Sequence, residues 1–137
     1  MTMVGLSKLD QMLDVEPITS IEGFKSQNAQ MLAARFGLTL AELPGLRRAL
    51  HDSLSGLERQ VEAGKIQRGY AARMLAAEAM FYYEKSARGK DFKLVIPGQT
   101  SFSDGLYDHV TGVNPNAARA DATFGNMYAT KAFEYSS

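Results

Sequence analysis

The feature that most constrains the fold is a repeated spacing of apolar residues through the middle of the chain. Between Leu43 and Val61, leucine or valine recurs at intervals of three, four, four, three and four residues. This is the period of one face of an α-helix, whereas a strand would place apolar residues at every second position. We therefore predict a mostly α protein in which a third helix begins near Leu40 and continues to Gly64.

A fourth helix of similar length is predicted from residue 66 to Gly89. Ala72, Ala76 and Ala79 form a strip along one of its sides, and small side chains allow a second helix to approach closely. The short connection at residues 64–69 predicts that this helix and the preceding one form an antiparallel hairpin at the centre of a bundle of about four helices.

The N-terminal part of the chain predicts two further helices. Residues 6–13 carry leucines on one helical face and indicate a short amphipathic helix. In the next helix, Thr19 and Glu22 have the spacing of a capping box, in which each side chain bonds the backbone amide of the other. Because glycine commonly ends a helix, we expect this second helix to stop at Gly37.

The start of the third helix repeats the same signal. Thr39 is followed three residues later by Glu42, and Leu38 and Leu43 have the spacing of a hydrophobic staple. Pro44 stands just past the first helical turn, where proline removes a backbone hydrogen bond. We expect a kink or a restart of the helix at this proline.

Residues 31–50 also have the outline of a helix-turn-helix, with Ala33, Gly37 and Leu43 at the positions that such a motif prefers. Two helices that meet at a corner explain the same residues, and Pro44 would lie inside the recognition helix. We favour the corner. The alternative is a helix-turn-helix-like nucleic-acid-binding regulator that would use three basic side chains: Arg47, Arg48 and His51.

After Gly89 the composition changes. Phe92 to Pro97 is a short β-like run, and the residues that follow are rich in Gly, Asn, Ser, Thr and Asp. Aliphatic residues are few there, whereas aromatic residues, which gain from burial, are frequent. We predict a helical domain over residues 1–90 and an extended, largely irregular C-terminal arm over residues 91–137.

Such an arm cannot easily build a core of its own, so we expect it to lie across another surface, either its own bundle or another subunit. Its aromatic side chains would bind a neighbouring protein subunit in a homo- or hetero-oligomer. The residues predicted to do so are Phe102, Tyr107, Phe124, Tyr128, Phe133 and Tyr135.

The sequence offers little for catalysis. The chain has no cysteine, which excludes a disulfide framework and a thiolate metal site. Asp104, Asp108 and His109 are the one cluster that combines carboxylates with an imidazole, and a metal needs more ligands than these. We therefore predict no catalytic residue, metal or cofactor; a small enzyme would have to use this loop.

Charge and hydropathy indicate the compartment in which we expect the protein to reside. The 15 basic and 15 acidic residues balance, with a basic excess in residues 45–93 and an acidic excess at both ends. No apolar run approaches the roughly 20 residues of a membrane span, and the first residues have neither a basic leader nor a long apolar segment. We expect a cytoplasmic protein, or one within a virion assembled there.

These observations favour a non-enzymatic assembly or adaptor subunit of a multisubunit complex, of the kind found in viral particles. Two alternatives remain beside it: the nucleic-acid-binding regulator described above, and a small inhibitor that blocks a partner enzyme with its acidic ends.

Overall fold

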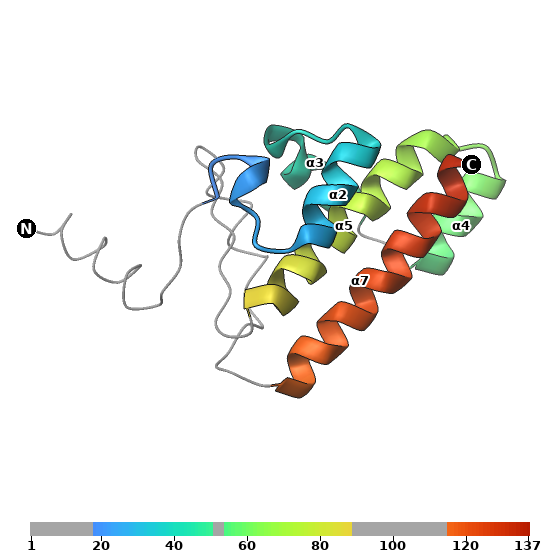
Figure 1. The fold of residues 1–137 in the computed structure, drawn as a ribbon. Coiled ribbons are helices and arrows are strands. Elements are labelled where there is room, and N and C mark those ends of the chain that lie inside the picture. Colours follow the sequence, from blue (N-terminus) through green and yellow to red (C-terminus); the bar gives the residue numbers. More distant parts are fainter. Residues whose placement is uncertain (1–17, 51–53, 89–114) are drawn as a thin grey trace, which may run out of the picture.

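In a computed structural model, residues 18–50, 54–88 and 115–137 are described (Figure 1). These residues contain helices and no strand, so the prediction of a mostly α protein is confirmed. None of the helices within them is long and apolar enough to cross a membrane. The elements in chain order are η1 (Ile21–Gly23), α2 (Gln27–Phe36), η2 (Leu40–Glu42), α3 (Leu43–Ala49), α4 (Leu54–Glu62), α5 (Arg68–Arg88) and α7 (Pro115–Ser136).

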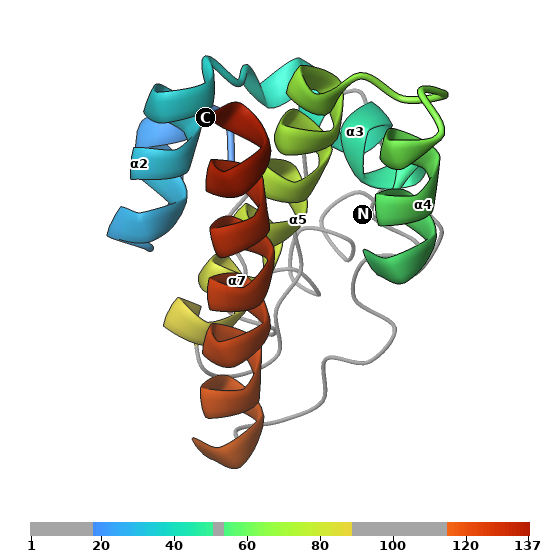
Figure 2. The ribbon, with the colours of Figure 1, turned by 90° about the vertical axis from the view of Figure 1, so that its right-hand side faces the viewer.

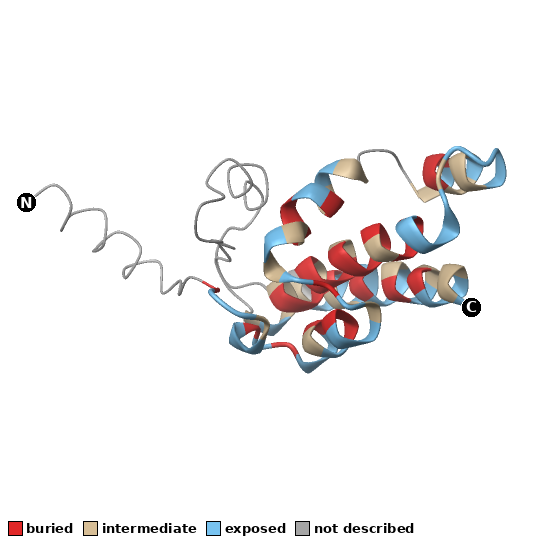
Figure 3. Cartoon of the chain, turned by 90° about the horizontal axis from the view of Figure 1, so that it is seen from above, coloured by how far each residue is buried: buried red, intermediate tan, exposed pale blue. Residues whose placement is uncertain are grey.

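Helix α5 is the centre of the described structure and packs against α2, α3, α4 and α7. Its strip of small residues is buried, since Ala72, Ala76 and Ala79 are each at most 1% exposed. Figure 3 shows buried positions along α5 and on the helix sides next to it. The prediction of a long helix sandwiched in the bundle is confirmed. α4 precedes it through a turn at Gly64, whose φ is +77°, but the most extensive packing of α5 is with α7.

Helices α5 and α7 run antiparallel side by side (Figures 1 and 2). At one end the hydroxyl of Ser86 donates to the carbonyl oxygen of Ala118 at 2.8 Å. At the other end the Arg68 guanidinium donates to the carbonyl oxygen of Glu134 at 2.9 Å. Between them, a Cβ atom added at Gly125 would lie 2.9 Å from the Tyr83 ring, so the two helices approach closely.

This packing corrects the prediction of an extended, irregular arm for residues 115–136, which form a helix on the protein's own bundle. The apolar surface that covers this helix is supplied by α5. The helix itself contributes the small residues Gly125, Ala129 and Ala132, all buried. The β-like run at 92–97 and the domain boundary predicted at residue 90 lie outside the described residues.

The N-terminal corner is also corrected. Thr19 and Glu22 form no capping box at the start of a long helix; α2 begins later, and the Ser26 hydroxyl caps it by accepting from the amide of Ala29 at 3.2 Å. Gly37 ends the helix as predicted, with φ +64°. The helix predicted at 6–13 lies outside the described residues.

The second capping box is confirmed, because the amide of Thr39 donates to the Glu42 carboxylate at 2.7 Å. Leu38 and Leu43 are both buried in the same core. Pro44 lies in the first turn of α3, which restarts after η2. The single helix predicted from Leu40 to Gly64 is wrong, because α3 ends at Ala49 and Leu50 has a non-helical backbone.

Candidate interaction surface

Two of the aromatic residues predicted to bind a partner contact the protein's own α5. The rings of Phe124 and Tyr128 lie beside the ring of Tyr82, with centroids 5.4 Å and 5.7 Å away. Tyr128 is stacked on Tyr82 and half-buried, whereas Phe124 remains 45% exposed. Phe124 thus packs against α5 and is still partly accessible to solvent.

The two aromatic residues near the end of α7 also contact other parts of the chain and remain partly exposed. The Phe133 ring lies 5.4 Å from that of Phe36 on α2, and it is 36% exposed. The guanidinium of Arg68 lies over the ring of Tyr135 at 5.0 Å. The remaining predicted partner-binding residues, Phe102 and Tyr107, lie outside the described residues.

The side of α7 that points away from α5 forms a distinct surface, which we name the outward face. It consists of five exposed residues at spacings of three, four, three and four: Ala120, Thr123, Met127, Thr130 and Glu134. In Figure 2, α7 lies in front of α5, with α2 to its left and α4 to its right. Phe124 borders this face beside Met127, which is 39% exposed.

The outward face carries no charged side chain before Glu134. A surface helix ordinarily places charged residues toward solvent, but the charged Asp121 of α7 lies buried with Lys85 3.6 Å away. The hydroxyls of the two threonines of this face already donate hydrogen bonds within α7. Thr123 donates to the carbonyl oxygen of Arg119 at 3.0 Å, and Thr130 donates to that of Asn126 at 2.7 Å.

A buried carboxylate holds α2 against α5. Glu84 is fully buried and accepts hydrogen bonds at 2.9 Å from the backbone amides of Lys25 and Ser26. The Arg88 guanidinium donates to the same carboxylate at 2.7 Å. Because Glu84 fixes these two amides, α2 starts after Ser26, which explains why the capping box predicted at Thr19 does not form. Sequence reasoning missed this role; the only local signal is the spacing of Glu84 and Arg88.

Of the three basic residues predicted to bind nucleic acid, one is engaged in an ion pair, one is exposed and one lies outside the described residues. The Arg47 side chain is only 14% exposed, pairs with Glu78 and stacks on Phe81 at 3.8 Å from the ring centroid. Arg48 is exposed on the surface of α3. His51 lies outside the described residues.

The tyrosine next to this ion pair is held in its neutral form. Burial raises the pKa of Tyr82 to about 12, and the negative charge of Glu78 contributes in the same direction. A phenol with so high a pKa stays protonated at neutral pH. The Tyr82 ring packs against those of Phe81, Phe124 and Tyr128.

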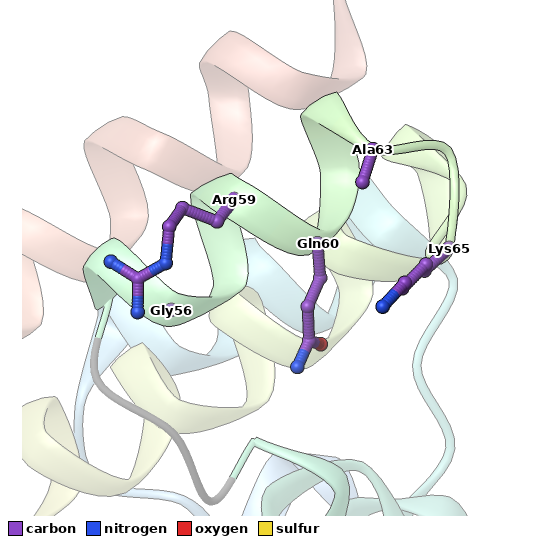
Figure 4. A pocket seen from close by; sticks show the side chains of 5 residues that line it. All are labelled: Gly56, Arg59, Gln60, Ala63 and Lys65. Atoms are coloured by element: carbon purple, nitrogen blue, oxygen red, sulfur yellow. The ribbon is translucent and has the colours of Figure 1, made fainter.

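A shallow pocket of about 260 Å³ lies along α4 (Figure 4). The residues that line it are Gly56, Arg59, Gln60, Ala63 and Lys65.

The described residues contain no group of three or more His, Asp or Glu side chains that could hold a metal. The loop residues Asp104, Asp108 and His109 lie outside the described part of the chain.

Comparisons of the chain with protein-family models, with curated proteins and with solved structures found no match.

Proposed function

We propose that the protein is a non-enzymatic assembly or adaptor subunit that binds a neighbouring protein subunit through the outward face of α7. The observation that carries this proposal is a surface helix whose solvent side is uncharged from Ala120 to Thr130. It presents the exposed Met127 at its centre, and the exposed Phe124 borders it.

The chemistry of this face favours a protein partner. Aromatic residues and methionine are enriched in protein interfaces, where charged residues are depleted at the core. The hydroxyls of Thr123 and Thr130 already have acceptors within α7, so burying them costs little desolvation free energy. A nucleic-acid backbone would instead require lysine or arginine on the binding face, and Arg47 is engaged with Glu78.

The position of α7 also suits an adaptor. Its inner side is fixed on α5 by buried small residues and by hydrogen bonds at both ends. A helix that is already formed and held in place loses little conformational entropy when a partner binds. The bundle thus supplies a rigid base for the outward face.

The test uses one charged substitution on the face and a matched one elsewhere. Met127→Asp places a charge at the centre of the outward face, whereas Met31→Asp makes the same change at an exposed position of α2. We expect tagged Met127→Asp protein, recovered from its native source, to lose the subunits that the wild type retains. Met31→Asp should keep them, and both variants should unfold at wild-type urea concentrations. Retention of every subunit by Met127→Asp would contradict the proposal.

A further inference from the structure

We propose that the neighbour bound by the outward face of α7 is a second copy of this chain, docked antiparallel about a twofold axis near Met127. This inference rests on the proposed function and specifies its partner. It follows from the spacing, size and charge of the residues on that face.

The spacing of the outward face is that of a helix-pairing seam. Alternating steps of three and four residues bring successive side chains to one line, which is the pattern by which two helices interlock along their length. The seam is occupied by small residues on either side of a single large one, since Ala120 and Thr123 precede Met127 and Thr130 follows it. Small residues at a crossing let two backbones approach closely.

The charges at the two ends of the seam select the second copy and its direction. Arg119 and Glu134 are exposed and lie at equal sequence distances from the point between Asn126 and Met127. In an antiparallel pair, Arg119 of each copy therefore lies beside Glu134 of the other, because a twofold interface repeats every contact. A parallel pair would place like charges together at both ends.

The carboxylate of Glu134 is accessible for such a contact. It lies 2.9 Å from the ammonium of Lys131, yet its side chain remains 55% exposed. Glu134 at one end of the outward face and Arg119 directly before its other end thus offer complementary charges to an inverted copy of the same face, with an uncharged stretch between them.

Engineered disulfides test the direction, because the chain has no cysteine of its own. In the antiparallel pair, residue 123 of one copy lies across from residue 130 of the other. We expect Thr123→Cys protein mixed with Thr130→Cys protein to cross-link under mild oxidation, whereas neither variant cross-links with itself. Met127→Cys, at the axis, should cross-link alone. Self-cross-linking of the two threonine variants would indicate a parallel pair and overturn the proposal.

Charge reversal tests the end contacts by sedimentation equilibrium. Arg119→Glu and Glu134→Arg each convert two attractive pairs into repulsive ones, and each should raise the dimer dissociation constant about tenfold. The double variant restores opposite charges across the interface and should return to near the wild-type value. A double variant as weak as the single ones would contradict the antiparallel arrangement.

The failure of this inference is distinguishable from failure of the proposed function. A wild-type protein that is monomeric at every concentration and forms no mixed cross-link overturns the second copy as partner. If Met127→Asp still loses subunits from the native source, the adaptor function stands with a different protein as the neighbour. If Met127→Asp also keeps all subunits, both proposals are wrong.

Discussion

Substitution of Glu84 should remove the contact that fixes α2 to the end of α5. The carboxylate is fully buried and accepts hydrogen bonds from the backbone amides of Lys25 and Ser26, 59 and 58 residues away in sequence. Both amides precede the first residue of α2 and therefore have no partner within that helix. Glu84→Ala takes away their common acceptor and leaves space where the carboxylate stood.

The expected cost follows from these contacts. A hydrogen bond to a charged acceptor contributes about 1.5–3 kcal/mol, and breaking a buried charged pair by removing one member costs about 3–5 kcal/mol. Glu84→Ala removes two such amide bonds together with the contact to Arg88. We expect the free energy of unfolding to fall by about 3–5 kcal/mol. Glu84→Gln keeps one carbonyl oxygen as an acceptor and should cost about half as much.

Equilibrium urea unfolding followed by circular dichroism measures this change. Glu62→Ala, which removes an exposed glutamate of α4, is the matched control and should stay within about 0.5 kcal/mol of wild type. Amide hydrogen exchange should become faster at the start of α2 in Glu84→Ala. A loss below about 1 kcal/mol, or unchanged exchange there, would refute the assignment of Glu84 as the anchor of α2.

Two further predictions concern the α5–α7 interface. Gly125→Ala should lower the melting temperature, because its Cβ would lie 2.9 Å from the Tyr83 ring and overpacking of about 1–3 kcal/mol exceeds the gain of about 1 kcal/mol in helix propensity. Gly69→Ala, which meets nothing within 4 Å, should not; an equal response of both variants would contradict the close approach. Burial raises the pKa of Tyr82 to about 12, above about 10 in the unfolded chain, so its contribution to stability is complete below pH 10 and is lost as the pH rises to 12. Urea unfolding across this range should show a smaller alkaline loss for Tyr82→Phe, and a loss as steep as that of wild type would disprove the assignment.

Local sequence determined the elements whose contacts lie within a few residues. The capping box of Thr39 and Glu42 forms because its groups are three residues apart, and Gly37 ends α2 because glycine adopts φ +64° without a steric penalty. Helix α5 was predictable over nearly its whole length, since the segment contains no proline and is rich in strong helix formers such as alanine and methionine. Neither kind of signal depends on a distant part of the chain.

Tertiary structure decided the start of α2 and the conformation of residues 115–136. Thr19 and Glu22 have the spacing of a capping box, but Glu84, distant in sequence, binds the amides that set the helix start at Gln27. Ser26 also provides a local N-cap for α2, but no propensity of either segment contains the contact with Glu84. A buried long-range acceptor outweighs an exposed local cap because an unpaired amide in the core costs more free energy than one in water.

The candidate interaction surface was likewise predicted in part from the sequence and decided in part by tertiary packing. Composition predicted that the aromatic residues of the C-terminal segment bind a partner, and it could not tell how far each ring is buried within the chain itself. The small residues Gly125, Ala129 and Ala132 contribute little to an apolar pattern, yet they let α7 lie close against α5. That packing turns Phe124 partly toward Tyr82 and leaves Met127 facing solvent. Which side of a helix faces solvent depends on the element against which it packs. For α7 that element is α5, which ends 27 residues before α7 begins.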